Sequence, residues 1–137
     1  EGQRVCELKR KGLLSEVLNQ QIIEDICGSA GIGFVKYLFS HNTKYEPMMP
    51  FVYQTDHGNS MIALDGTILN RNFNFCELVN KINGPLESFQ DYMESLKGTY
   101  NLIYIDEGKM LIARDPYGIK PMCFGKLKDT FIAVSES

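Results

Sequence analysis

Apolar residues recur with different spacings in the first forty positions and predict three elements there. Residues 4–8 alternate weakly between polar and apolar side chains, which is typical of a short strand. Asn19 is of the type that caps helices, and three isoleucines would share one face of a helix over residues 20–27, which Gly28 would end. Residues 31–39 are apolar and rich in β-branched and aromatic side chains, so they predict a buried strand.

The middle of the chain predicts a hairpin followed by two helices. Residues 51–54 and 60–64 flank a turn of Asp, His, Gly and Asn, which is a hairpin signal. A helix is expected over residues 75–82. A second helix should begin near Pro85 and end before Gly98, because its apolar residues recur at helical spacing.

Three or four further strands are expected in the last third, within residues 99–105, 109–114, 121–125 and 130–135. Hairpins interrupted by a helix pair indicate one α/β domain of stacked layers with antiparallel sheets over residues 1–137. The sequence opens in a predicted strand and stops after another, which suggests a partial domain.

Composition is that of a soluble globular protein. The chain has 137 residues, of which 44% are hydrophobic and 23% charged, with a net charge of −3. The absence of a basic patch argues against a nucleic-acid partner, and the apolar runs are too short to cross a membrane. Together with the lack of a signal-peptide pattern, this predicts a cytoplasmic location.

Cysteine and histidine offer little chemistry. The spread of the four cysteines would allow two disulfides, but usage favours reduced, partly buried thiols. Cys6, Cys27 and Cys123 fall at expected core positions. His41, in a predicted loop over residues 41–50, and His57 have no partner at ligand spacing, so neither a metal nor a cofactor is expected.

The strongest local signal is the turn that begins at Arg114. Pro116 fixes φ, Gly118 permits a positive φ, and the Asp115 carboxylate can accept hydrogen bonds from backbone amides. Arg114 can pair with an acid or bind carbonyl oxygens. Taken alone, this segment predicts a structural turn, with no nucleophile and no catalytic role.

This turn and the residues after it resemble the glutaminase domain of amidophosphoribosyltransferases, which is a class II glutamine amidotransferase domain. Residues 114–122, Arg-Asp-Pro-Tyr-Gly-Ile-Lys-Pro-Met, are similar to the Arg-Asp-Pro-x-Gly-Ile-Arg-Pro-Leu element of that family, and 133–137 to its Ala-Ser-Glu-Ser element. Upstream segments fit in the same order: residues 11–17, 31–37, 50–51, 63–66 and 98–102. The resemblance therefore covers nearly the whole chain.

The resemblance implies the four-layer αββα sandwich of N-terminal-nucleophile hydrolases. In that family a free N-terminal Cys attacks the amide carbon of glutamine and releases ammonia, which passes to a phosphoribosyltransferase domain. Residue 1 of this sequence is Glu, and the family's opening strand and phosphoribosyltransferase domain have no counterpart in it. On this basis the domain is expected to be truncated.

Three positions depart from the family's substrate pocket. The arginine that holds the glutamine carboxylate aligns with Lys36, the oxyanion asparagine with Asp65, and the aspartate that holds the substrate ammonium with Phe75. An ammonium lacks the guanidinium fork, and a carboxylate cannot donate to an oxyanion. A shift of the alignment by one residue is the alternative explanation, and it applies most to Phe75.

The remaining pocket positions implied by the resemblance are Tyr37, Gly66, Cys76 and Glu77. Gly66 keeps its family type in the oxyanion region. Cys76 stands beside an acidic residue, which is a poor setting for a reactive thiolate, so it is expected to be structural.

These departures predict a degenerate domain, or pseudoenzyme, with a structural, regulatory or ligand-binding role and at most weak binding of a glutamine-like molecule. One alternative is a fragment of an active amidotransferase whose Cys nucleophile lies in a missing segment. Another is an unrelated α+β domain that binds a small molecule. An unpaired sheet edge also predicts self-association.

Overall fold

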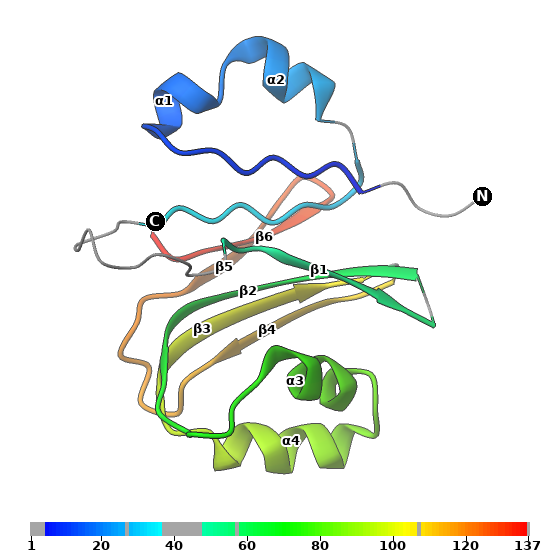
Figure 1. Cartoon of the computed structure of the whole chain (residues 1–137), viewed down its shortest axis with the longest axis vertical. Helices are drawn as coiled ribbons and strands as arrows, with labels where there is room; N and C mark the ends of the chain where they lie inside the picture. Colours follow the sequence, from blue (N-terminus) through cyan, green and yellow to red (C-terminus); the bar gives the residue numbers. More distant parts are fainter. Residues whose placement is uncertain (1–4, 27, 37–47, 57, 107, 137) are drawn as a thin grey trace. The chain divides into compact units, whose positions relative to one another are not determined.

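A computed structural model of the chain describes residues 5–26, 28–36, 48–56, 58–106 and 108–136. The elements are α1 (Leu14–Val17), α2 (Gln20–Asp25), β1 (Phe51–Thr55), β2 (Gly58–Ile68), α3 (Phe75–Ile82), α4 (Leu86–Ser95), β3 (Gly98–Ile105), β4 (Met110–Arg114), β5 (Cys123–Leu127) and β6 (Thr130–Val134) (Figure 1). Strands β1 to β4 form one sheet in the order β1-β2-β3-β4, and β5 pairs with β6 in a second sheet. No described helix has the length and apolar character needed to cross a membrane.

The residues form two compact units. The first comprises residues 1–63 and 103–111, and the second comprises residues 64–102 and 112–137. Strands β2, β3 and β4 each include residues of both units.

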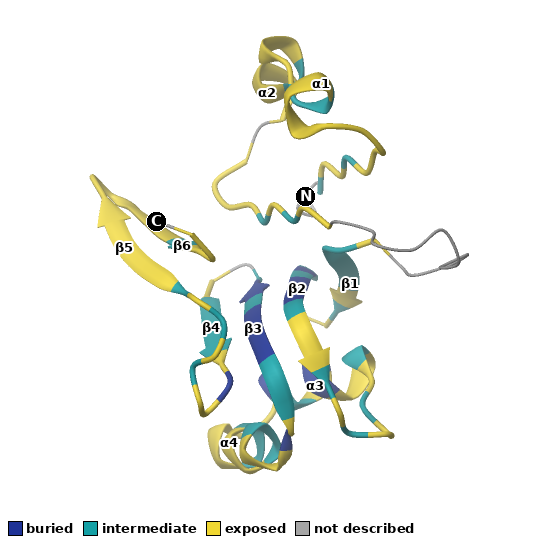
Figure 2. Cartoon of the chain, turned by 90° about the vertical axis from the view of Figure 1, so that its left-hand side faces the viewer, coloured by how far each residue is buried: buried dark blue, intermediate teal, exposed yellow. Residues whose placement is uncertain are grey.

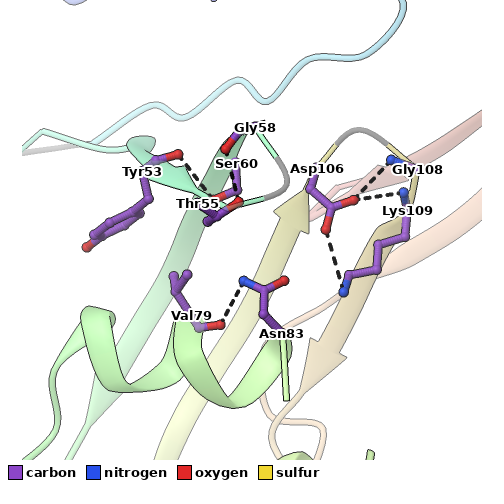
Figure 3. Close-up of polar contacts among 9 residues, drawn as sticks. All are labelled: Tyr53, Thr55, Gly58, Ser60, Val79, Asn83, Asp106, Gly108 and Lys109. Carbon is purple, nitrogen blue, oxygen red and sulfur yellow. Dashed lines mark hydrogen bonds and ion pairs between the residues drawn. The ribbon is translucent and has the colours of Figure 1, made fainter. Parts of the chain in front are cut away.

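The predicted hairpin in the first unit is confirmed. β1 and β2 are antiparallel, with Phe51 opposite Ile62 and Thr55 opposite Gly58. The Thr55 hydroxyl donates to the Gly58 carbonyl oxygen at 3.0 Å, and the Ser60 hydroxyl donates to the Tyr53 carbonyl oxygen at 3.4 Å (Figure 3). These contacts satisfy polar groups close to the turn.

Asp106 organises the turn that joins β3 and β4. Its carboxylate accepts the amides of Gly108 and Lys109 and forms an ion pair with the Lys109 ammonium at 3.5 Å (Figure 3). Burial raises the pKa of Asp106, but the two amides, the Lys109 charge and a Tyr104 hydrogen bond outweigh it, so the pKa is lowered. The predicted hairpin of residues 99–114 is thereby formed.

Two predicted N-terminal strands are wrong over the residues that the structure describes. Residues 5–8 and 31–36 adopt no strand, and most of them are exposed. A strand is stable only when its backbone groups find a partner strand, and alternation along the sequence does not supply one. The short helix α1, which was not predicted, lies between these two segments in the sequence.

Helix α2 begins as predicted, since the Asn19 side chain accepts the Ile22 amide at 3.0 Å. The helix ends at Asp25, two residues before the predicted end. Its apolar face is not buried: Ile23 and Ile26 are exposed, and no residue of the helix is buried. Most of the predicted loop over residues 41–50, with His41, lies outside the described residues, as do Cys27 and His57.

Helices α3 and α4 confirm the predicted helix pair and form the core of the second unit with the adjoining strand segments. Figure 1 shows both helices on one side of β2 and β3. The buried apolar side chains of this unit are Leu64, Leu78, Val79, Ile82, Leu96, Tyr100 and Leu102. Burial of this many apolar groups is what stabilises the unit. The fold is therefore α/β with antiparallel strand pairing, as predicted.

The β5–β6 hairpin is antiparallel, with Cys123 opposite Val134 and Leu127 opposite Thr130. β5 begins two residues later than predicted, after Pro121. All of β5 and most of β6 are exposed (Figure 2). The placement of Cys123 and Cys6 in the core is consequently wrong, because both thiols are exposed. A hydrophobic sequence alone does not show whether another layer covers the hairpin.

Candidate functional site

The second unit contains most of the predicted pocket. Asp65 and Gly66 lie in β2, and Phe75, Cys76 and Glu77 form the first turn of α3. Lys36 is an exposed residue of the first unit, so its place beside the others stays a prediction. Tyr37 lies outside the described residues.

Gly66 marks a close approach between β2 and β3. Its φ is 133°, and a Cβ at this position would lie 2.0 Å from the Thr99 carbonyl oxygen and 2.8 Å from the Tyr100 Cα. Gly98 makes the corresponding approach to Ile68 from the other strand. Gly66 therefore faces Tyr100 and Gly98 faces Ile68, so the two strands are antiparallel.

This register has a direct consequence for Asp65. The residue before Gly66 on β2 faces the residue after Tyr100 on β3, and that residue is Asn101. Side chains opposite each other in an antiparallel pair lie on the same face of the sheet, with Cβ atoms roughly 5 Å apart. Asp65 and Asn101 thus share the sheet face opposite to the buried Tyr100 and Leu102 side chains.

The Asp65 carboxylate is engaged by a lysine. The Lys120 ammonium lies 2.9 Å from Oδ1 and 3.0 Å from Oδ2 of Asp65, so one cation binds both carboxylate oxygens. The side chains are partly exposed, 33% for Lys120 and 43% for Asp65. An ion pair this open to water adds little to stability, but it fixes which group the carboxylate faces.

Asn101 is the polar residue in the otherwise apolar interior of β3. It is 3% exposed, and its Nδ2 donates to the Pro121 carbonyl oxygen at 2.6 Å. Its Oδ1 is buried without a hydrogen-bond partner among the described residues. Most buried polar atoms are paired, so an unpaired acceptor is unusual.

The predicted pocket residues on α3 lie in its first turn, next to the residue that caps the helix. Asn74 caps α3 by accepting the Glu77 amide at 2.8 Å. Phe75 is half-buried and packs edge-on against Phe73, with ring centroids 5.1 Å apart. The Cys76 thiol is exposed, as is Glu77. An aromatic ring in this contact offers no charge to a substrate ammonium.

Asp115 holds the turn that connects β4 to β5. It is 3% exposed, and its carboxylate accepts amides from Tyr100 at 3.3 Å, Tyr117 at 3.0 Å and Ile119 at 3.4 Å. Its own amide donates to the Tyr100 carbonyl oxygen at 2.9 Å. Burial raises the pKa of Asp115, but the hydrogen bonds from Ile119, Tyr100, Tyr117 and Gly118 outweigh it and lower that pKa.

Arg114 closes the same turn from its outer side. Its Nε donates to the Lys120 carbonyl oxygen at 2.7 Å, and its Nη2 donates to the Gly118 carbonyl oxygen. Gly118 has a φ of 60°, as the sequence predicts. The turn directs Lys120 and Pro121 towards Asp65 and Asn101.

Two residues of this arrangement were not found from the sequence. Lys120 is 55 positions from Asp65, and a separation of that size leaves no sequence signal. Asn101 did carry a signal, because it interrupts an apolar strand that is expected to be buried. Among the residues that the structure describes, no three His, Cys, Asp or Glu side chains gather as a metal site would require.

Comparisons with known proteins bear out the resemblance. Residues 74–137 match the glutamine amidotransferase domain family. The amidophosphoribosyltransferase of Methanocaldococcus jannaschii is 24% identical in an alignment that covers 99% of the chain. The enzyme of Bacillus subtilis is 23% identical in an alignment that covers 100% of the chain. The enzyme of Archaeoglobus fulgidus is 28% identical over 92%. The chain spans about a third of the length of these relatives, with coverages of 34%, 33% and 33%.

Solved structures show the same fold. The glutamine phosphoribosylpyrophosphate amidotransferase of B. subtilis, complexed with ADP and GMP, matches 90% of the chain with a TM-score of 0.70 and 23% identity, over 31% of its own length. A structure described as the allosteric regulatory enzyme of purine biosynthesis matches 90% of the chain and 31% of its own, with a TM-score of 0.71 and 23% identity. The predicted layered fold is thereby confirmed.

Proposed function

Since the chain is related to the glutaminase half of amidophosphoribosyltransferases, the enzymes named in these comparisons, we propose that it is an amidotransferase-like domain whose pocket does not hydrolyse glutamine. Its role is ligand binding, regulation or structural support, in a cytoplasmic protein connected with purine biosynthesis. The fold is kept and the chemistry of the pocket is altered.

The Asp65–Lys120 ion pair carries this proposal. The resemblance aligns Asp65 with an asparagine whose amide donates to the oxyanion of the reaction. A carboxylate at that position only accepts hydrogen bonds, and both of its oxygens already face the Lys120 ammonium. Loss of one oxyanion donor typically lowers the rate by about 10²–10³.

The packing of Phe75 supports the same conclusion. The aligned family residue is an aspartate that binds the substrate ammonium, whereas Phe75 is half-buried against Phe73. Restoring a charge here would also break an aromatic contact. The proposed loss of glutamine binding therefore includes a position that now contributes to the packing of α3.

Lys36 adds a third change, at the position of the carboxylate-binding arginine. An ammonium binds a carboxylate as a point charge, without the bidentate geometry of a guanidinium. The three changes concern different groups of the substrate, so their effects on glutamine affinity should accumulate. A glutamine-like molecule would bind weakly at best.

Calorimetry with glutamine tests this proposal. The triple variant Asp65→Asn, Lys36→Arg, Phe75→Asp should bind glutamine more tightly than the wild-type chain, because it restores all three family side chains. Asp91→Asn with Lys97→Arg makes chemically similar changes at exposed positions and should leave the affinity unchanged. Wild-type binding as tight as that of the triple variant would overturn the proposal and favour a fragment of an active amidotransferase.

A further inference from the structure

Asp65 and Asn101 present three acceptor atoms on one face of the sheet. They face each other across β2 and β3, as the close approaches of Gly66 and Gly98 establish. Two of the acceptors are the carboxylate oxygens of Asp65, and the third is Oδ1 of Asn101. The Lys120 ammonium, which binds the carboxylate, is the cation beside them.

The buried Asn101 oxygen points to a ligand. Its amide nitrogen is committed to the Pro121 carbonyl at 2.6 Å, which fixes the side-chain orientation with Oδ1 as the free end. That oxygen has no partner among the described residues, although Asn101 is only 3% exposed. An unpaired buried acceptor is unfavourable, and only a hydrogen-bond donor or a cation can satisfy it.

We propose that Asp65 and Asn101 form a binding subsite for the primary ammonium group of a small ligand, and that Lys120 occupies it until the ligand displaces it. This inference rests on the proposed ligand-binding role. An ammonium supplies the charge that Asp65 requires and N–H donors for both residues. An anion would meet only acceptors once Lys120 had left.

A divalent metal fits this set of side chains less well than an ammonium group. The subsite contains one carboxylate, and no group of three His, Cys, Asp or Glu side chains exists in the described part of the chain. Ca²⁺ needs six or more oxygen ligands, and Mg²⁺ needs near-ideal octahedral geometry. An ammonium group tolerates a site with two or three acceptors.

Lys120 can leave without unfolding the segment that carries it. The backbone on its N-terminal side is held by Asp115, which binds the Tyr100 amide, and on its C-terminal side by the Asn101 contact to Pro121. Only the flexible lysine side chain has to swing away from Asp65. A tethered group competes like a free ligand at about millimolar concentration, so a millimolar external ammonium can displace it.

The test is a titration of the ¹⁵N-labelled chain with methylammonium chloride, followed by NMR through the Asn101 side-chain amide and the Gly66 backbone amide. Sodium chloride and tetramethylammonium chloride at equal ionic strength are the references. Lys120→Met should bind methylammonium about fivefold more tightly than wild type, because it removes an exposed ion-pair partner. Lys97→Met, the same change at an exposed lysine, should match wild type.

Adding Asp65→Asn to Lys120→Met should abolish the response. The proposed subsite would be overturned if Lys120→Met and wild type bound methylammonium with equal affinity. It would also be overturned if the response survived Asp65→Asn, or if tetramethylammonium gave an equal response. If Lys120→Met does not fold, the comparison of wild type with the single variant Asp65→Asn is sufficient, because only wild type should respond to methylammonium. Glutamine hydrolysis by the chain would refute the proposed function but would leave these outcomes unchanged.

Discussion

At the scale of single residues, the segment from Arg114 to Pro121 shows how few groups determine a backbone path. Asp115 accepts the Tyr117 amide within the turn and the Tyr100 amide of β3, and Gly118 occupies the left-handed region with a φ of 60°. A Cβ on Gly118 would lie 3.1 Å from the Arg114 guanidinium carbon. The sequence predicted the positive φ from the residue types, because Pro and Gly constrain local angles.

Gly118→Val should therefore destabilise the domain. A left-handed conformation costs an L-residue about 1–2 kcal/mol, and more when the side chain is β-branched. The melting temperature should fall by roughly 3–8 °C for that loss. Gly125→Val is the control, because a Cβ there meets nothing within 4 Å and its φ is not positive. Equal melting temperatures for the Gly118 variant and wild type would refute the structural role of the turn.

Asp115 predicts a pH dependence. Its folded pKa is lowered, so its carboxylate stabilises the folded state fully above the unfolded pKa of about 3.9, and this contribution is lost as the pH falls through the folded pKa. Asp115→Asn should be less stable than wild type in urea unfolding at pH 7, and the difference should shrink below pH 4. A difference that stays constant from pH 7 to pH 3 would show that the carboxylate charge is not involved.

At the scale of elements, the predictions that rest on local sequence signals are confirmed, and those that need a tertiary partner are wrong. Helices α3 and α4 and the hairpins were predictable, because a cap, an apolar stripe or a turn sequence acts within a few residues. Residues 5–8 and 31–36 have strand-like sequences but no strand conformation. Strand formation depends on a partner that the local sequence does not contain.

The β5–β6 hairpin exposes large apolar side chains. Phe124 and Phe131 stack with centroids 5.9 Å apart, yet they are 61% and 58% exposed, and Leu127 is 65% exposed. A two-stranded sheet is marginal on its own, and exposed strand edges recruit other chains.

We therefore propose that the chain self-associates through this hairpin. Light scattering should give a mass above that of a monomer that rises with concentration. Phe124→Glu with Phe131→Lys should lower it, because charged residues disfavour packing of the exposed faces. Leu86→Glu, at a 68% exposed position on α4, is the control and should behave as wild type. A wild-type monomer at every concentration would contradict the proposal.

At the scale of the whole molecule, the fold is shown by the solved structures, and the altered pocket chemistry is our proposal. The fold is retained with a TM-score of 0.70 at 23% identity, because many sequences fill the same core. The pocket depends on single functional groups. The resemblance led to Asp65, but the lysine that binds it could not be predicted, since the two residues meet only in the folded chain.

Whether the altered pocket can hydrolyse glutamine is tested by glutamate release, measured in a coupled assay. The chain would be joined to the opening Cys-containing segment of the B. subtilis relative, which supplies the family's nucleophile. No turnover is predicted, because the Asp65 carboxylate cannot donate a hydrogen bond to the developing oxyanion, and the resemblance aligns Lys36 and Phe75 with the arginine and aspartate that bind the substrate. Turnover in this fusion, with Asp65, Lys36 and Phe75 unchanged, would contradict the account and identify an active glutamine amidotransferase.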